Sequence, residues 1–366
     1  MKKILFITPR MDKGGSEVAL FHIINHIKNF QCFVYSEKNG VLLKKLPKHI
    51  KHFIDPLQRP IDYYKNFIYK KLLKKSISQR YLEKLLVKEK FDACVLNTIT
   101  TAKWIPIIKK FKLPICIMNH EMYSIYETIS SEDVKNLLDK TDFIISLSGS
   151  SYEIIQKAGF NKKHYLFYEP IDSDVINVKN LNLSWNKNFS YVFGMSGVFY
   201  TRKGAYIIVE LARYLKSKNS ALIWLGEVWN TGLTELIKRQ LKNLNLNNVF
   251  FTGELDWDIY YSYLNSIDAF LLTSIEEPYG IVCLEAMYLK KPIIAFNSGG
   301  PKEYIKNGIG RLVPLLNLKA MFQAIDDFIS NKIFVDENLL RKEAEKHDIK
   351  CRINEFEKIL IEGFNW

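Results

Sequence analysis

Two glutamates, Glu277 and Glu285, have the spacing and surroundings most suited to chemistry in this chain. Between residues 281 and 289 every side chain except Glu285 is apolar or aromatic, which predicts a buried helix that holds one carboxylate. Removing a carboxylate from water is costly unless hydrogen bonds replace the lost hydration. A ligand with paired hydroxyls, such as a ribose, would satisfy both oxygens of Glu285. The alternatives are a side chain that points to water or one that meets a buried Arg or Lys.

Two adjacent cations, Arg202 and Lys203, follow a predicted strand and precede Gly204 and a helical pattern from about residue 205. At the turn between a strand and a helix they are placed to bind a polyanion such as a diphosphate, arginine as a fork and lysine as a point charge. A solvated pair of loop charges explains this segment equally well.

The helix that carries Glu285 is expected to begin near Ile281, after a loop at 276–280. Its first N–H groups, on Gly280, Ile281 and Val282, lack intrahelical partners, and the helix dipole favours an anion beside them. This end of the helix therefore predicts a second contribution to anion binding.

A glycine pair, Gly14 and Gly15, follows the first predicted strand and precedes a helix opened by Ser16 and Glu17. Glycines let backbone N–H groups approach a phosphate, although such a pair more often forms only a turn. No GxGxxG follows that strand and no GxxxxGK[ST] occurs in the sequence, which argues against dinucleotide-binding and P-loop proteins.

The elements that must position these residues follow an α/β pattern, in which short runs of Val, Ile and Phe alternate with helical segments. Strands are expected at 3–8, 32–36, 92–97, 114–118, 142–147, 164–168, 190–195, 221–226, 248–252, 268–273, 292–296 and 311–313. The chain of 366 residues is long enough for two domains, each with a parallel, doubly wound, Rossmann-like sheet. The predicted divisions are an N-terminal domain at 1–172, a linker at 173–188, a C-terminal domain at 189–340 and a C-terminal helix at 341–366, for which packing back on the N-terminal domain is one option.

Several segments occur together in an order that is specific. The strings GGSE, RKG, EEPYGIVCLEAM, GGPKE and NGIGRLVP follow one another along the chain, and the third contains Glu277 and Glu285 as E-x7-E. This ensemble resembles glycosyltransferase family 4, the retaining enzymes that use nucleotide-activated sugars. The resemblance covers most of the chain and is strongest in the C-terminal half. It implies the GT-B fold, in which two Rossmann-like domains face each other across a cleft.

On this resemblance the C-terminal domain would bind the sugar donor. Glu285 would bind the nucleotide ribose, and Glu277 would hold hydroxyls of the donor sugar near the reacting carbon. Arg202 and Lys203 would bind the diphosphate and stabilise it as the leaving group. The other donor-binding residues that the family pattern implies are Gly197, Tyr279, Gly280, Ile281 and Val282.

The N-terminal domain would receive the acceptor. Gly15 would let a loop of this domain close over the phosphates, and His120 would lie at a strand end beside the donor sugar. One departure concerns the cations: many members have arginine directly after the glycine that ends the first strand of the C-terminal domain, whereas Gly197 precedes Val198 here. Which cation contacts which phosphate is therefore left open.

The implied function is retaining transfer of a hexose from a UDP-sugar, favoured over a GDP-sugar, to a glycan or lipid-linked acceptor in the synthesis of cell-surface polysaccharide. No general base is assigned, no cofactor is expected, and no metal is required because the two cations would neutralise the diphosphate. A sugar-nucleotide epimerase or hydrolase of the same fold is the alternative. A basic nucleic-acid-binding protein fits the calculated pI of about 9.2 but leaves Glu285 without a purpose.

The net charge of +13 lies almost entirely in residues 1–180. Within these residues, positions 65–90 form a lysine-rich stretch with interleaved aromatic and aliphatic side chains. Such a stretch fits binding to an anionic membrane surface, or it is merely a solvated face. No signal peptide or membrane-spanning run is expected, and the five separated cysteines indicate reduced core thiols rather than disulfides or a zinc site. These features predict a cytoplasmic protein, with peripheral attachment to the inner face of the cytoplasmic membrane as an option.

Overall fold

The computed structural model describes residues 1–73, 75–181 and 188–366, which form two compact units. Unit 1 comprises Met1–Pro170 and Ile349–Trp366, and unit 2 comprises Ile171–Asp348. The sequence placed the corresponding divisions at 172 and 340. Part of the predicted linker, residues 182–187, and Lys74 of the basic stretch lie outside the described residues.

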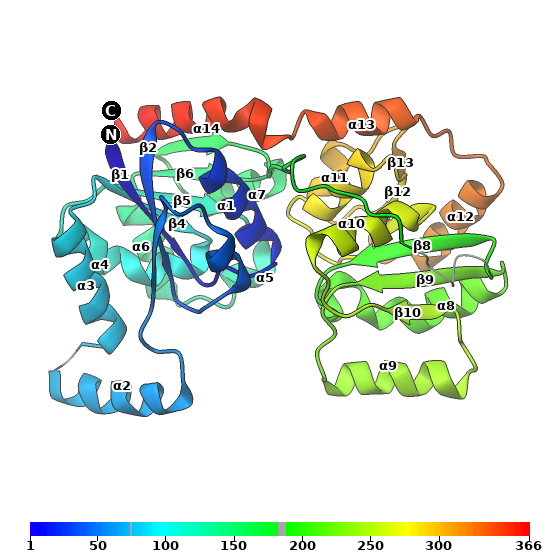
Figure 1. Cartoon of the computed structure of the whole chain (residues 1–366), viewed down its shortest axis with the longest axis horizontal. Helices are drawn as coiled ribbons and strands as arrows, with labels where there is room; N and C mark the ends of the chain where they lie inside the picture. Colours follow the sequence, from blue (N-terminus) through cyan, green and yellow to red (C-terminus); the bar gives the residue numbers. More distant parts are fainter. Residues whose placement is uncertain (74, 182–187) are drawn as a thin grey trace. The chain divides into compact units, whose positions relative to one another are not determined.

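Unit 1 contains a parallel sheet of seven strands in the order β3-β2-β1-β4-β5-β6-β7 (Figure 1). Its strands are β1 (Lys2–Thr8), β2 (Phe30–Ser36), β3 (Lys51–Ile54), β4 (Ala93–Asn97), β5 (Ile115–Asn119), β6 (Phe143–Ser146) and β7 (Lys163–Leu166). Its helices are α1 (Gly15–His26), α2 (Pro60–Leu73), α3 (Ile77–Glu89), α4 (Ile105–Lys110), α5 (Tyr123–Tyr126), α6 (Ser131–Lys140), α7 (Gly149–Lys157) and α14 (Ile349–Phe364), with short 3-10 turns η1 (Val41–Lys45) and η2 (Ile99–Trp104). The buried strands are almost wholly apolar, as expected for a sheet covered on both faces.

Strand β3 was not predicted from the sequence. It reads Lys-His-Phe-Ile, and it pairs only with β2 because it forms one edge of the sheet. Lys51 and His52 are exposed and Phe53 and Ile54 are only half-buried. An edge strand can carry charge in this way, and it then lacks the apolar run that identifies the central strands.

Unit 2 contains a parallel sheet of six strands in the order β10-β9-β8-β11-β12-β13. Its strands are β8 (Tyr191–Ser196), β9 (Ser220–Leu225), β10 (Val249–Phe251), β11 (Ala269–Leu272), β12 (Ile293–Phe296) and β13 (Gly310–Val313). Its helices are α8 (Ile208–Lys216), α9 (Gly232–Asn243), α10 (Trp257–Ser266), α11 (Ile281–Tyr288), α12 (Leu318–Ile329) and α13 (Glu337–Glu345), with 3-10 turns η4 (Thr201–Lys203), η5 (Ala205–Ile207) and η6 (Gly300–Glu303). The central strand β8 lies beside β11, so the loops that follow these two strands meet at one edge of the sheet.

The C-terminal helical pattern, which the sequence suggested as one helix, forms two. Helix α13 ends at Glu345 and α14 begins at Ile349. Between them, the carbonyl of His347 accepts a hydrogen bond from the N–H of Ile171 at 3.0 Å, and Asp348 pairs with Ile171 in a short parallel bridge. Helix α14 contacts α1 and belongs to unit 1.

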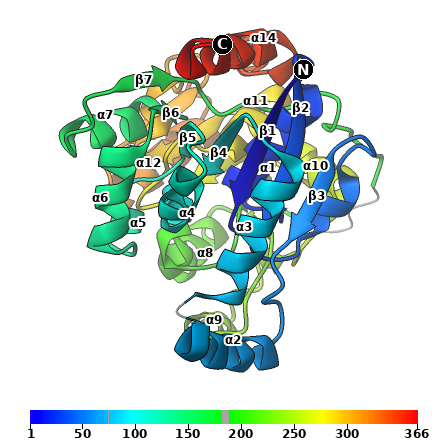
Figure 2. The same ribbon diagram turned by 90° about the vertical axis from the view of Figure 1, so that its left-hand side faces the viewer.

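The basic stretch at 65–90 also forms two helices rather than one, α2 and α3 (Figure 2). Helix α3 begins with a capping box in which Ser76 and Gln79 exchange hydrogen bonds. Its apolar residues Leu82, Leu85 and Leu86 are buried in the core of unit 1. The amphipathic pattern of α3 is thus explained by packing within the unit.

All five cysteines are free thiols, and Cys351 alone among them is exposed. Among the helices of the described residues, none combines the length and the apolar character that a bilayer crossing would need.

Candidate functional site

Glu277 and Lys203 form a buried ion pair in unit 2, where the loops after β8 and β11 meet. The Nζ atom of Lys203 lies 2.6 Å from Oε2 of Glu277, and the hydroxyl of Ser274 donates to the same oxygen at 2.8 Å. Burial raises the pKa of Glu277, but the charges of Lys203 and Arg202 outweigh it and hold this pKa below its usual value. Glu277 is therefore an oriented carboxylate anion.

The loop that carries Glu277 is fixed by its backbone. The N–H of Glu277 donates to the carbonyl of Ser298 at 3.0 Å, and the N–H of Gly300 donates to the carbonyl of Glu277 at 2.9 Å. These bonds tie the loop to the turn after β12, so the carboxylate is positioned by two neighbouring strand ends rather than by one flexible loop.

Arg202 is held in place beside this pair. Its Nε donates to the hydroxyl of Tyr200 at 2.6 Å, and one terminal nitrogen donates to the carbonyl of Glu276 at 2.9 Å. Burial lowers the pKa of Arg202, and the nearby charge of Glu277 reverses this, leaving the pKa raised. Two cations thus lie side by side with the carboxylates of Glu277 and Glu276 nearby, and the guanidinium and ammonium groups are the ones suited to an anionic ligand.

Two glycines shape the loop that presents these cations. Gly204 has φ +92°, and a Cβ there would lie 2.0 Å from Oγ1 of Thr273, so only glycine lets η4 approach the end of β11 this closely. Gly197 has φ +124°, and the side chain of Lys203 passes beside it, with Cδ 3.6 Å from the position of an added Cβ. The predicted binding residue Gly197 therefore lies next to the ion pair.

Glu285 is buried inside α11, as the sequence predicted, with 6% of its surface exposed. Its partners are two tyrosines of α10: the Tyr261 hydroxyl donates to Oε1 at 2.9 Å and the Tyr260 hydroxyl donates to Oε2 at 3.0 Å. Burial raises the pKa of Glu285 to about 7, although both tyrosine hydrogen bonds act to lower it. Glu285 is thus a buried side chain that two tyrosine hydroxyls hold, which is neither the solvent-facing side chain nor the pair with a buried Arg or Lys that the sequence offered as alternatives.

The tyrosines also connect Glu285 to the loop after β8. The hydroxyl of Tyr260 lies 3.1 Å from Oγ of Ser196, the last residue of β8, and Gly197 follows directly. The two glutamates of the E-x7-E block therefore lie at the two ends of one polar group that spans the carboxyl ends of β8 and β11.

The start of α11 is formed by Gly280, which has φ +89° and provides no side-chain cap. Ile281 is buried and Val282 is half-buried in the first turn. Tyr279 is buried to 1% exposure, with its hydroxyl 3.2 Å from the imidazole of His347 and its carbonyl accepting from the Tyr304 hydroxyl at 2.8 Å. His347 and Tyr304 thus hold Tyr279 in place at the start of α11.

The remaining predicted residues, Gly15 and His120, belong to unit 1. Gly15 is exposed at the first position of α1, and nothing lies within 4 Å of a Cβ added there. His120 follows β5 and is buried between two partners: Nδ1 lies 2.9 Å from Oε1 of Glu169, and Nε2 lies 2.9 Å from Oδ1 of Asn97. The amide of Asn97 is oriented by its Nδ2, which donates to the carbonyl of Ser16 at 3.2 Å.

A second group of carboxylates surrounds His120. Glu121 accepts from the N–H groups of His120 at 3.0 Å and Ile99 at 3.3 Å, and burial raises its pKa to about 7. Burial also raises the pKa of Glu17, whose carboxylate accepts from Ser16 at 3.0 Å. His120 therefore lies in an acidic environment at the carboxyl ends of β1, β4 and β5.

Sequence reasoning missed the partners of the predicted residues, namely Tyr200, Tyr260, Tyr261, Asn97 and Glu169. The adjacent tyrosines of α10 offered a signal, because two hydroxyls on a half-buried helix need acceptors. Nothing in the local sequence around Asn97 or Glu169 indicates that they meet at His120, since 49 positions separate Glu169 from the histidine.

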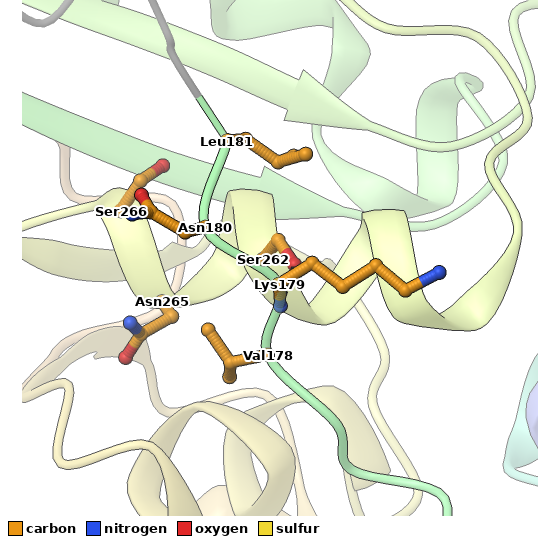
Figure 3. Close-up of a pocket in the computed structure, with 7 residues that line it drawn as sticks. All are labelled: Val178, Lys179, Asn180, Leu181, Ser262, Asn265 and Ser266. Carbon is orange, nitrogen blue, oxygen red and sulfur yellow. Dashed lines mark hydrogen bonds between the residues drawn. The ribbon is translucent and has the colours of Figure 1, made fainter.

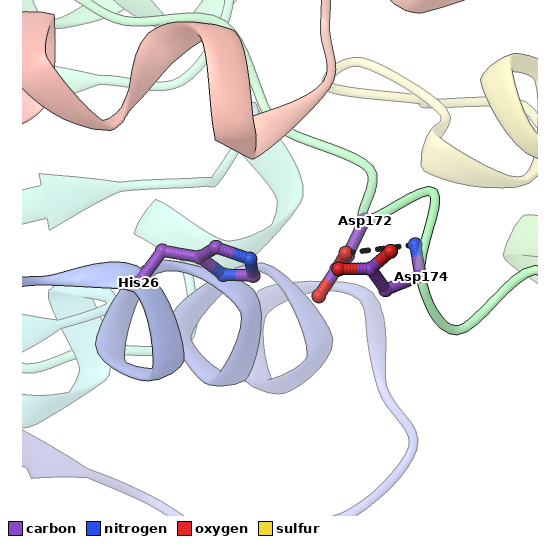
Figure 4. Close-up of side chains that lie close together, drawn as sticks. All are labelled: His26, Asp172 and Asp174. Atoms are coloured by element: carbon purple, nitrogen blue, oxygen red, sulfur yellow. Dashed lines mark hydrogen bonds between the residues drawn. The ribbon is translucent and has the colours of Figure 1, made fainter.

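Two further features of unit 2 involve other residues. A pocket of about 370 Å³ is lined by the chain at 178–181 and by Ser262, Asn265 and Ser266 of α10 (Figure 3). Asp172 accepts from the backbone N–H of Asp174 at 3.0 Å, which closes a turn at the start of the unit (Figure 4). His26, also labelled there, is part of α1 in unit 1.

Comparisons with known proteins bear on the family and the fold of the chain. Residues 184–347 match the family model of the glycosyl transferases group 1. A processive diacylglycerol alpha-glucosyltransferase of Acholeplasma laidlawii is 25% identical over 57% of this chain and 66% of that enzyme. A lipopolysaccharide core biosynthesis glycosyltransferase, LpsD of Rhizobium meliloti, is 34% identical over 28% of this chain and 32% of that protein. The chain thus spans just under two thirds of the first relative and about a third of the second.

Among solved structures, the Anabaena protein Alr3699/HepE in complex with UDP and glucose superposes with a TM-score of 0.80 at 20% identity, covering 98% of this chain and 99% of that one. At this identity the likeness establishes the fold, which is GT-B with two parallel Rossmann-like sheets. Together with the family match in the C-terminal half, the fold supports a glycosyltransferase of the GT-B type.

Proposed function

We propose that this protein is a retaining glycosyltransferase of family 4 that transfers a sugar from a nucleoside diphosphate sugar to a glycan or lipid-linked acceptor. A UDP-sugar is favoured over a GDP-sugar as the donor. The observation that carries the proposal is the polar group of unit 2. In it, Arg202 and Lys203 of the loop after β8 bond to the loop after β11, which carries Glu277, and Glu285 is linked through Tyr260 to Ser196 at the end of β8. Cations for a diphosphate and carboxylates for hydroxyls are the two kinds of group that such a donor needs.

The diphosphate would bind to Arg202 and Lys203. Because Lys203 already pairs with Glu277 at 2.6 Å, an incoming phosphate would share the ammonium group rather than meet an unpaired one. Arg202 keeps its orientation through Tyr200 and Glu276, so its remaining N–H groups can donate without rearrangement. Both cations would then stabilise the charge that develops on the leaving diphosphate, and a metal ion would not be needed for this.

The two glutamates would bind hydroxyls of the donor. Each oxygen of a carboxylate can accept more than one hydrogen bond, so Glu285 can accept from ribose hydroxyls while the tyrosines remain bonded. Lys203 and Ser274 both contact Oε2 of Glu277, and within the described part of the chain Oε1 has no such hydrogen bond. Oε1 would therefore receive the hydroxyls of the transferred sugar.

Relatives support the choice of donor and acceptor. The Anabaena protein was crystallised with UDP and glucose and with UDP-glucose, and the Acholeplasma relative is named as a diacylglycerol glucosyltransferase. In unit 1, Nε2 of His120 can donate to the hydroxyl of a bound sugar only where that hydroxyl replaces the Asn97 amide oxygen as its acceptor. We assign no general base, because the leaving phosphate itself can accept the proton of the acceptor hydroxyl.

The reaction is tested by incubating the protein in EDTA with UDP- and GDP-sugars and a panel of glycan and diacylglycerol acceptors. We expect release of one nucleoside diphosphate only when an acceptor is present, with a product whose anomeric proton has the same configuration as the donor by NMR. Glu277→Gln should lower kcat about a hundredfold. The control is Glu235→Gln, which changes an exposed carboxylate of α9 that is not part of the polar group.

Three outcomes would contradict the proposal. Conversion of a sugar nucleotide without any acceptor would indicate the epimerase or hydrolase alternative. Transfer with inversion would exclude family 4 chemistry, and equal losses in the two glutamine variants would remove Glu277 from the donor site.

A further inference from the structure

Helix α2 of unit 1 is exposed around nearly its whole circumference. Of its side chains from Pro60 to Lys71, Asp62 alone is buried and Asn66 alone is half-buried. The exposed large apolar and aromatic residues are Ile61 at 53%, Tyr63 at 53%, Tyr64 at 65%, Phe67 at 67%, Ile68 at 42% and Tyr69 at 41%. A soluble surface rarely gathers so many large apolar side chains on one helix, and a patch of this kind usually marks an interaction site.

The orientation of α2 is fixed by its contacts with α3. Asn66 Oδ1 accepts from the N–H of Ile77 at 2.9 Å, and the guanidinium of Arg80 lies 5.9 Å from the ring of Tyr69. Asn66 and Tyr69 are three positions apart and so share one face, which is turned toward α3. Tyr64, Phe67 and Lys71 have helical spacings that place them on the opposite face, away from the body of unit 1, and Figures 1 and 2 both draw α2 beyond α3 and away from the sheet.

The charges beside this apolar face are positive. Lys65, Lys70 and Lys71 are exposed on α2 itself. The neighbouring surface of α3 and α4 contains a hollow of about 630 Å³, lined by Lys75, Arg80, Glu83, Lys84, Val87, Lys110 and Phe111. Glu83 is paired with Lys75 at 2.9 Å and with Lys110 at 3.7 Å, so its charge is already balanced and the lining remains net positive.

The hollow and the helix are one continuous surface, because Arg80 lines the first and contacts Tyr69 of the second. Val87, with 61% of its surface exposed, adds an apolar residue to the hollow. The combination of exposed aromatic rings, aliphatic side chains and lysines on one short helix is that of a helix lying in a membrane interface. Cations close by would contact phosphate headgroups.

We propose that α2 and the adjacent basic hollow dock this protein onto an anionic phospholipid bilayer, with Tyr64, Phe67 and Ile68 entering the interface and Lys65, Lys70 and Lys71 contacting headgroups. Charge complementarity favours this occupant over a second copy of the chain, because a copy would bring the same excess of lysines against itself. The proposal does not depend on the proposed transferase activity, since it concerns binding to lipid alone.

The test is flotation of the full chain with vesicles of phosphatidylcholine alone and of phosphatidylcholine mixed with phosphatidylglycerol. We expect binding only to the mixed vesicles, and weakening of that binding as salt is added. Phe67→Ser should reduce partitioning about tenfold, because it removes one inserted ring. Each of Lys65→Ala, Lys70→Ala and Lys71→Ala should reduce it about fivefold.

The matched control is Phe334→Ser in unit 2, which removes a phenylalanine of similar exposure, 62%, from a position far along the chain. Because all these side chains are exposed, none of the variants should alter folding, and circular dichroism checks this. Equal flotation of the Phe67 and Phe334 variants, or equal binding to neutral and anionic vesicles, would overturn the proposal. A concentration-dependent dimer that Phe67→Ser dissociates, with no vesicle binding, would instead assign the face to a second copy and overturn it as well.

Discussion

Lys203 and Glu277 lie 74 positions apart in the sequence and form a buried ion pair of 2.6 Å, with 17% and 6% of their side chains exposed. The pair joins the loop after β8 to the loop after β11. In a buried pair, loss of one partner leaves the other charge without compensation, and the cost exceeds what the pair contributes when both members are present.

The first prediction concerns the energetic coupling of this pair. Glu277→Gln should lower the free energy of unfolding by about 3 kcal/mol and Lys203→Met by less than that, while the double variant should lose less than the sum of the two. Urea denaturation of the four proteins gives the coupling energy. The loss in Lys203→Met should be the more moderate one, because Arg202 also offsets the charge of Glu277. Strict additivity would show that the two side chains do not interact in solution.

The second prediction compares two glycines with nearly the same φ. Gly204 has φ +92° and a Cβ there would meet Thr273 at 2.0 Å, whereas Gly159 has φ +91° and open space. Gly159→Ala should cost about 1 kcal/mol from backbone strain alone. Gly204→Ala should cost clearly more, and it should displace the loop that carries Arg202 and Lys203. Thermal unfolding of the two variants measures their losses of stability. Similar losses for the two variants would contradict the close packing of Gly204 against Thr273.

The third prediction follows from the pKa of Glu285, which burial raises from 4.5 to about 7. A raised pKa means that the fold prefers the protonated acid, so this contribution to stability is complete below about pH 4.5 and is lost as the pH rises through about 7. Glu285→Gln removes the titration. Its stability should therefore improve relative to the parent protein between about pH 5 and pH 8, by up to about 3 kcal/mol.

Denaturant midpoints at several pH values measure this difference. Glu121 also has a pKa near 7, but it is present in both proteins and cancels from the comparison. Tyr261→Phe is a useful companion, because it removes one hydrogen bond that lowers the pKa of Glu285 and should raise that pKa further. Parallel pH profiles for the parent and Glu285→Gln would show that Glu285 does not titrate in this range.

The fourth prediction concerns the polar contacts of His120 in unit 1. His120→Ala leaves the buried groups of Asn97 and Glu169 without their partner and should reduce the free energy of unfolding by about 2 kcal/mol. The control is His49→Ala, because His49 is exposed and its loss should have little effect. Chemical denaturation of both variants checks the difference. A loss for His120→Ala no greater than for the control would mean that these buried contacts contribute nothing to stability.

The sequence predicted the central strands of both sheets and the apolar helix around Glu285, because buried parallel strands and buried helices leave strong hydrophobic patterns. It missed β3, whose polar residues reflect an edge position, and it treated residues 65–90 as one stretch where Ser76 begins a new helix. The hydrogen-bond and ion-pair partners of the site residues were harder to predict than the elements that carry these residues. Nothing local indicates that Lys203 meets Glu277, or that Tyr260 and Tyr261 rather than a cation satisfy Glu285, since these contacts depend on the order of strands in the sheet.

Calorimetric titration in EDTA with UDP, GDP and ADP tests the central claim most directly, because it asks whether the polar group around Glu277 and Glu285 binds a nucleoside diphosphate at all. Our account predicts that one of them binds without metal, and that Glu285→Ala weakens that binding at least tenfold while Glu235→Gln leaves it unchanged. If none of the three binds, or if the Glu285 variant binds as tightly as the parent protein, the assignment of this group as a donor site is wrong.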